Sequence, residues 1–375
     1  MNRLAARELS MGVALVVIWA FFAWQEPVFL SSRNLSLLSV ELAITAVLAL
    51  GMFVVLLPGQ IDLSAGSGVG LTGAVAAVLV YHHDMPAAGA LLLAASGAVL
   101  VWAAMGALIA VERIPAFIMT LGGLLVFRGL HWLVIRNQTV PVVEGGSQNL
   151  YSLLTTWYLP AAAGYALAAA AVALLAYSTL RARRRRRAYG FPVEDGELAF
   201  LKLLVLAQLI ALVVIVTQGY RGVPAALVIL ALVATLVHQL VTNTSFGRYL
   251  YAIGGNEEAA LVSGVPVRRV IVGAYALMGA VVALCGFMQT AYAGASTSTV
   301  GSLMELDAVA ACVIGGTSLR GGRGTVVGVL FGALIMASLL NGMTLMAVSP
   351  EAKYIARGAV LALAVWLDLR LGRGR

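Results

Sequence analysis

The residues of this chain that could do chemistry are few, and most of them lie in three glycine-rich stretches. In the first stretch, Pro58 and Gly59 end an apolar run, and Asp62 and Ser64 follow just before a series of glycines that begins at Gly66. Irregular backbone at membrane depth is tolerated only against protein or water, so these groups could line a polar pathway for a solute. The alternative is a plain surface turn in which Asp62 and Ser64 cap the next helix.

The second stretch runs from Ala311 to Thr325 and consists mostly of glycine and polar residues, so it cannot face lipid. It follows two acids, Glu305 and Asp307, each of which would cost about 2.5–3.5 kcal/mol if it faced the membrane interior. We interpret the stretch as pathway backbone and a gate; packing glycines around a tight cytoplasmic turn are the alternative. The candidate pathway residues of both stretches are Asp62, Ser64, Gly66, Gly315, Gly316, Thr317 and Asp307.

The third stretch, residues 243–269, separates two apolar runs and predicts a short helix outside the membrane. Asn256 is a favoured N-cap, and Glu257 and Glu258 suit the positive N-terminal end of a helix. Gly264 and Pro266 end that helix. We expect a partner to dock on it, although a solvated connector would also fit. The candidate docking residues are Gly254, Gly255, Asn256, Glu257, Glu258, Ala259 and Leu261.

Other kinds of chemistry find little support in the sequence. No phosphate-binding GxxxxGK[ST] motif occurs, and neither of the two lysines, Lys202 and Lys353, follows a glycine, so any ATP must be bound by another polypeptide. Cys285 and Cys312 lie inside apolar runs, where we expect buried free thiols. We interpret the four histidines as structural and expect no metal, no cofactor and no catalytic residue. The structural histidines are His82, His83, His131 and His238.

The elements that must position these residues are transmembrane helices. The chain has 375 residues, of which 61% are hydrophobic and only 11% charged, and its mean hydropathy is +0.97. Because a bilayer core needs about 20 apolar residues per helix, we predict an all-α, polytopic membrane domain over 1–375 with about 10–12 helices, one of them either broken or re-entrant. The predicted spans are Met11–Trp24, Leu37–Leu57, Ser67–Tyr81, Ala88–Val111, Pro115–Ile135, Leu159–Leu180, Leu201–Gln218, Pro224–Val241, Val270–Tyr292, Asp307–Leu319, Thr325–Leu340 and Tyr354–Leu369. The first of these is expected to be a retained helix rather than a signal peptide.

The basic residues orient these helices. Most of the 24 lysine and arginine residues fall in gaps that lie on one side when the spans alternate from an inside N-terminus, which places both termini in the cytoplasm. The run Arg181–Arg187 could bind RNA or anionic lipid. We interpret it instead as a topology anchor and expect no nucleic-acid partner.

Four segments together resemble the permease family of bacterial ABC importers for pentoses and related sugars. Their order along the chain also follows that family, and the resemblance covers nearly the whole sequence. The segments are IDLSAGS at Ile61–Ser67, Ile114–Leu130, FGRYLYAIGGNEEAALVSGV at Phe246–Val265 and Glu305–Ile335.

Within that family the chain is most similar to the xylose-type members. Ribose-type members are shorter, whereas here an additional helix pair with a basic cytoplasmic loop lies between residues 159 and 218. A helix pair leaves the orientation of every later helix unchanged. One departure is the segment Arg320–Gly324, which contains more arginine than the family pattern leads us to expect.

The resemblance implies a role and a set of partners. It implies the permease subunit of an ATP-binding-cassette importer in the bacterial inner membrane, translocating xylose or a related pentose. The partners it implies are a second copy of the permease in a homodimer, ATP-binding subunits present as one fused chain or two, a periplasmic sugar-binding protein and the lipid bilayer. In such a system residues 243–269 form the cytoplasmic coupling loop, with Asn256–Val262 as the coupling helix.

Two other classes of protein remain as alternatives. An ion-gradient-driven secondary sugar transporter would need acids within its helices, for which Glu41 and Asp307 are the candidates. A membrane-embedded enzyme or flippase would need a convergent set of polar residues at one leaflet, which the sequence does not indicate.

Overall fold

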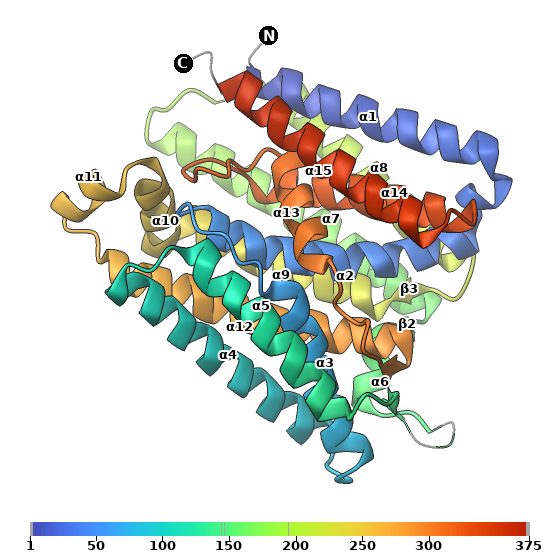
Figure 1. Cartoon of the computed structure of the whole chain (residues 1–375). Helices are drawn as coiled ribbons and strands as arrows, with labels where there is room; N and C mark the ends of the chain where they lie inside the picture. The colour runs from blue at the N-terminus through green and yellow to red at the C-terminus, as the bar shows by residue number, and fades with distance from the viewer. Residues whose placement is uncertain (1–2, 144, 146, 194, 373–375) are drawn as a thin grey trace.

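The computed structural model describes residues 3–143, 145, 147–193 and 195–372, so the ends of the predicted domain, residues 1–2 and 373–375, lie outside it. The described chain is almost entirely helical (Figure 1). Its α-helices are α1 Arg3–Gln25, α2 Ser32–Leu56, α3 Ala65–Tyr81, α4 Ala87–Glu112, α5 Ala116–Ile135, α6 Leu150–Thr156, α7 Ala161–Ala188, α8 Gly196–Gln218, α9 Ala225–Asn243, α10 Ser245–Gly255, α11 Glu257–Val262, α12 Val267–Ala293, α13 Met304–Ile314, α14 Val326–Leu345 and α15 Pro350–Gly372. A 3-10 helix, Pro27–Leu30, joins α1 to α2.

The helices confirm the predicted all-α, multi-pass membrane protein. Within the described residues, eight helices are long and apolar enough to cross a membrane, and shorter apolar helices cover Met11–Gln25 and Ala65–Tyr81. Each predicted span falls on a helix. The span predicted for Asp307–Leu319 differs at its end, because α13 already ends at Ile314, just before the two glycines Gly315 and Gly316.

The core of the bundle surrounds α2, which is buried along most of its length between α9, α12, α13 and α14. Glycines allow the closest helix crossings. A Cβ on Gly51 of α2 would lie 2.7 Å from Val281 of α12, and a Cβ on Gly279 of α12 would lie 2.7 Å from the carbonyl oxygen of Ala98 in α4. The central helices therefore touch nearly backbone to backbone.

The helix pair α7 and α8 lies at the edge of the bundle, where the sequence predicts an additional pair. Most side chains of both helices are exposed, as expected for a surface that meets lipid. α7 packs chiefly on α8, and α8 in turn contacts α2. A two-stranded sheet, β2 Tyr158–Leu159 with β3 Val223–Pro224, ties the start of the pair to the chain that follows it.

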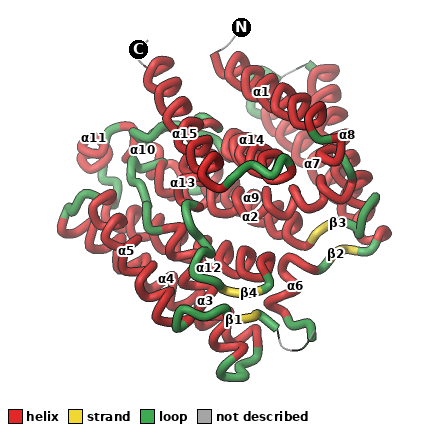
Figure 2. The backbone as a smooth tube through the Cα atoms, turned by 45° about the vertical axis from the view of Figure 1, so that its right-hand side comes forward, coloured by secondary structure: helices red, strands yellow, loops and turns green. Residues whose placement is uncertain are grey.

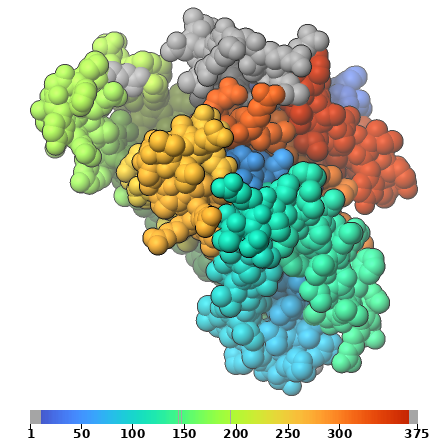
Figure 3. All heavy atoms as spheres, turned by 60° about the vertical axis from the view of Figure 1, so that its left-hand side comes forward, coloured from blue at the N-terminus to red at the C-terminus, as the bar shows by residue number. Residues whose placement is uncertain are grey.

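The two ends of the bundle differ in what covers them (Figure 2). At one end, called here the sheet end, β2–β3 lies near a second small sheet formed by β1 Val140–Pro141 and β4 Ala295–Ser296. At the other end, called here the α11 end, α10 and α11 project beside the loop between α4 and α5 (Figures 1 and 3).

Candidate pathway and coupling segment

The first glycine-rich stretch separates α2 from α3, and its position within the membrane stays a prediction. α2 ends at Leu56 and α3 begins only at Ala65. Between them, Asp62 is fully buried: its Oδ1 accepts hydrogen bonds from Ser64 N at 2.9 Å and Ser64 Oγ at 2.6 Å, and its Oδ2 accepts one from Trp102 Nε1 at 2.7 Å. Asp62 and Ser64 are thus enclosed by protein, whereas Gly59 is exposed.

These contacts indicate that Asp62 holds the segment between α2 and α3 in place. Both carboxylate oxygens are occupied by donors of the chain itself, and Thr120 Oγ1 of α5 donates to Ile61 O at 3.1 Å. Asp62 accepts a hydrogen bond from the Ser64 N–H, as a capping residue would. The side chain of Ser64, at the N-cap of α3, makes no capping hydrogen bond. The break is therefore pinned to α4 and α5, and a pathway role for Asp62 and Ser64 remains a prediction.

The first turn of α3 packs against the start of α13. A Cβ on Gly66 would lie 2.6 Å from Gly301 O, and it would also collide with Glu305 Oε2. α13 has 11 residues, and at about 1.5 Å per residue such a helix spans only about half of a hydrocarbon core of about 30 Å. α13 is thus a half-length helix preceded by irregular chain, which matches the predicted broken segment.

The end of α13 leads into the second glycine-rich stretch. Gly315 N donates to Ala311 O at 2.9 Å and Thr317 N to Cys312 O at 2.8 Å, while Gly316 takes a left-handed conformation with φ of +95°. Thr317 is fully buried. Gly315, Gly316 and Thr317 therefore form an enclosed helix end, and their part in gating stays a prediction.

Asp307 of α13 is buried and pairs with a cation from α15. Its Oδ1 lies 3.4 Å from Arg357 Nε. An acid within a membrane protein is tolerated where it is paired, so this ion pair explains how Asp307 can be buried and links α13 to α15.

Glu41, the other acid considered for ion coupling, is held by neutral donors. Its Oε1 accepts a hydrogen bond from Tyr292 Oη at 3.0 Å, and its Oε2 accepts one from Asn341 Nδ2 at 3.1 Å. Asn341 Oδ1 accepts in turn from Asn34 Nδ2 at 2.9 Å. This network joins α2, α12 and α14.

A glycine junction at the α11 end brings three distant segments together by their backbones. It consists of Leu57 and Gly59 after α2, Gly254 at the end of α10, and Gly321 and Gly322 in the second glycine-rich stretch. Gly322 N donates to Leu57 O at 2.9 Å. A Cβ on Gly321 would lie 2.7 Å from Gly59 N and 2.8 Å from Gly254 Cα, so no side chain fits there.

Tyr251 of α10 adds a side-chain link to the same region. Its hydroxyl donates to Gly324 O at 2.9 Å. Burial raises the pKa of Tyr251 above its usual value, so the hydroxyl keeps the proton that it donates. α10 is therefore attached to the second glycine-rich stretch by Tyr251 as well as by the glycine junction.

The short helix predicted in the third stretch is present as α11. Asn256 Oδ1 accepts a hydrogen bond from Ala259 N at 2.9 Å, and Glu257 and Glu258 occupy the first turn. Leu261 is 58% exposed and Val262 is 89% exposed, so both apolar side chains lie open at the end of the helix. Figure 1 shows α11 at the outer edge of the molecule, and the golden segment around it faces the viewer in Figure 3. The docking role of these residues remains a prediction.

A cavity of about 420 Å³, lined by both polar and apolar residues, lies between α3, α5, α13, α15 and the chain that precedes α13. We call it the α5–α13 cavity, and the sequence alone does not predict it. Arg128 and His131 face it from α5, where a spacing of three residues places them on one side of the helix, and that spacing was the available signal. His131, interpreted from the sequence as structural, also lies 3.4 Å from Ser296 Oγ through its Nε2. The other lining side chains used below are those of Ser67, Ser298, Glu305 and Tyr354.

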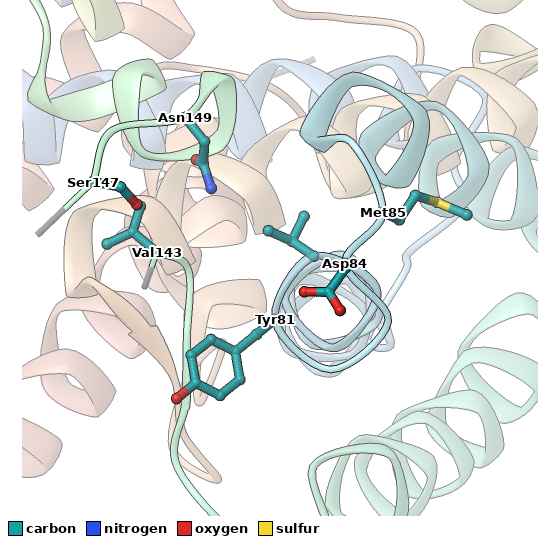
Figure 4. A pocket seen from close by; sticks show the side chains of 7 residues that line it. Tyr81, Asp84, Met85, Val143, Ser147 and Asn149 are labelled. Atoms are coloured by element: carbon teal, nitrogen blue, oxygen red, sulfur yellow. The ribbon is translucent and has the colours of Figure 1, made fainter. Parts of the chain in front are cut away.

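A smaller hollow of about 210 Å³ lies at the sheet end, where Asn149 and Asp84 point into it from two sides (Figure 4). Asn149 is already engaged, because its Nδ2 donates to Val142 O at 2.7 Å and its Oδ1 accepts from Ser152 N at 2.9 Å. The hollow shares no lining residue with the α5–α13 cavity.

Comparison with known proteins agrees with a multi-helix transport protein. Residues 34–365 match the family described as the permease component of the branched-chain amino acid transport system. The chain is 38% identical to the xylose transport system permease protein XylH of Escherichia coli K12, over 96% of this chain and 90% of the relative. It is 37% identical to XylH of Haemophilus influenzae, over 96% and 95%, and 32% identical to the ribose import permease protein RbsC of Escherichia coli K12, over 95% and 92%. No solved structure matches the chain significantly.

The family match over most of the chain and the similarity to xylose and ribose permeases identify a membrane transport protein. The chain belongs to the family described as the permease component of the branched-chain amino acid transport system.

Proposed function

We propose that this chain is the membrane-spanning permease subunit of an ABC importer that carries xylose or a related pentose across the bacterial inner membrane. The identity to xylose permeases over nearly the whole chain supports the substrate class. The observation that carries the coupling role is the exposed helix α11, because Leu261 and Val262 present an apolar surface outside the bundle. An exposed apolar pair at the end of an extramembrane helix offers a surface on which a partner can dock.

The proposed partner at the α11 end is the ATP-binding subunit, either as one fused chain or as two. Its closure on ATP would push α11, and Gly254 would pass that movement to the other members of the glycine junction. Because Leu57 precedes the first broken segment and Gly322 lies in the second, one displacement can shift both. In this account Gly254, Gly255, Asn256, Glu257, Glu258, Ala259 and Leu261 couple the ATPase to the pathway.

The remaining parts of the proposal concern assembly and orientation. Two copies of the chain form the permease dimer, and a periplasmic sugar-binding protein delivers the sugar at the sheet end. The α11 end and both termini then face the cytoplasm, in agreement with the distribution of arginine along the sequence. The surroundings of Glu41 give little support to a gradient-driven transporter, because its carboxylate already accepts hydrogen bonds from Tyr292 and Asn341.

Co-purification tests the coupling proposal. The permease is expressed with the ATP-binding subunits of the same source, and Leu261→Asp and Val262→Asp are compared with the native chain. We expect both variants to fold, because the two side chains are exposed, and to lose the ATP-binding subunits. A matched exposed substitution away from α11, Leu92→Ser on α4, should retain them. Full retention of the ATP-binding subunits by both α11 variants would refute α11 as the coupling helix.

A further inference from the structure

The α5–α13 cavity holds two opposite charges that are not paired with each other. Arg128 and Glu305 both line it, and in the described part of the chain no ion pair joins them. Glu305 is only 6% exposed, and the guanidinium of Arg128 lies 5.7 Å from the ring centre of Trp132. Charges within a membrane protein are costly, and where they are kept they usually mark a solute pathway or site.

The chemistry of the lining narrows the ligand to a neutral polyhydroxyl compound. Arginine supplies only hydrogen-bond donors and a carboxylate only acceptors, while a hydroxyl group can satisfy either one. Ser298 adds a further hydroxyl, and Ser67 Oγ, which already donates to Ser64 O at 2.9 Å, can still accept a hydrogen bond. An anion would meet the carboxylate of Glu305 and a cation would meet Arg128, so neither suits the whole cavity.

The size and lining of the cavity fit a monosaccharide. Its volume of about 420 Å³ falls within the range of about 300–1,000 Å³ that is typical of small-molecule sites. Tyr354 at the start of α15 also lines it and offers an aromatic ring beside the polar groups. A sugar ring has this combination of an apolar face and a polar edge.

We propose that the α5–α13 cavity is a sugar-binding site of the permease itself, in which Arg128 donates to sugar hydroxyls and Glu305 accepts from them. This inference rests on the proposed transport function. It goes beyond that function, because the permease would then take part in selecting the sugar and would not depend only on a delivering protein. The site has walls from α3, α5, α13 and α15, so movement of either broken segment would change its shape.

Protection of an introduced thiol tests the site without any need for ATP. Ser67→Cys places a thiol in the cavity wall, and the native Cys285 and Cys312 are buried. In full-length permease in nanodiscs, we expect xylose to slow maleimide labelling of this thiol by about tenfold at a concentration about ten times its dissociation constant. The matched control, Val143→Cys, lines the other hollow and should be labelled at the same rate with and without sugar.

Substitutions of the two charged residues and charged competitor compounds test whether the protection comes from the proposed site. Arg128→Gln and Glu305→Gln in the Ser67→Cys chain should each abolish protection, and citrate or choline should not replace xylose. Equal labelling of Ser67→Cys with and without xylose, in a chain that still takes up xylose with ATP when its partners are present, would overturn the cavity proposal alone. Protection by xylose combined with uptake that needs no ATP would overturn the importer proposal and leave the cavity standing.

Discussion

The backbone N–H of Gly322 donates a hydrogen bond to the carbonyl oxygen of Leu57 at 2.9 Å, although 265 positions separate the two residues in sequence number. The bond joins the end of α2 to the turn after α13. Gly254 of α10 packs against the same two residues. A rigid backbone connection of this kind can carry a displacement from an extramembrane helix into two broken helices at once.

The glycine junction predicts different stabilities for alanine substitutions at two neighbouring glycines. A Cβ on Gly254 would collide with Leu57 O and Gly322 N, whereas a Cβ on Gly255 would meet nothing within 4 Å. We expect Gly254→Ala to cost about 1–3 kcal/mol, as overpacking usually does, and to lower sugar uptake. Gly255→Ala is the matched control for packing and should leave the thermal stability unchanged. Thermal unfolding and uptake measured on both variants check this, and equal behaviour of the two would contradict the junction.

The pinning of the first broken segment predicts a cost for removing the Trp102 donor. Trp102→Phe leaves a buried Asp62 carboxylate oxygen without the hydrogen bond that it has at 2.7 Å. We expect a loss of about 1–3 kcal/mol in the free energy of unfolding. Trp157→Phe is the control, because Trp157 is half exposed. The measurement is chemical or thermal unfolding in detergent, and equal stabilities would show that the Trp102 bond contributes nothing.

The ion pair between Asp307 and Arg357 predicts coupled effects across α13 and α15. Arg357→Gln leaves the buried Asp307 without its cation, and we expect this to destabilise the protein by up to about 3 kcal/mol. Asp307→Asn combined with Arg357→Gln removes both charges and should recover part of that loss. A double-mutant cycle measured by thermal unfolding checks the coupling. Simple additivity of the two single changes would mean that the residues act independently.

The cap of α11 predicts a milder effect on coupling. Asn256→Ala removes the acceptor of the Ala259 N–H and should weaken the helix by about 1 kcal/mol, whereas Asn256→Asp keeps an acceptor. Hydrogen exchange of the α11 amides measures the change directly. We expect faster exchange and lower uptake for Asn256→Ala alone, and identical exchange in the two variants would show that the cap does not stabilise α11.

Much of the fold could be predicted from local signals in the sequence. Apolar runs locate the spans, Pro58 and Gly59 mark the break after α2, and Asn256, Glu257 and Gly264 delimit α11 within a residue or two. These signals work because each reports a requirement of its own segment, such as a helix cap or a turn.

The contacts between distant segments could not be predicted in the same way. Nothing in the residues near Leu57 indicates that Gly322 will meet it, and nothing near Asp62 indicates Trp102. The α5–α13 cavity was missed for the same reason, because Arg128 and Glu305 come to line one cavity only when α5 and α13 both pack against α3. Tertiary packing decides such pairs, and a single sequence does not reveal it.

The most direct test of the central claim is xylose uptake by the complete complex in proteoliposomes, with ATP enclosed or omitted. The account predicts accumulation that requires both ATP and the sugar-binding protein, that persists when ionophores remove proton and sodium gradients, and that is lost in Leu261→Asp. Accumulation driven by an ion gradient without ATP, or by the permease without its partners, would contradict it.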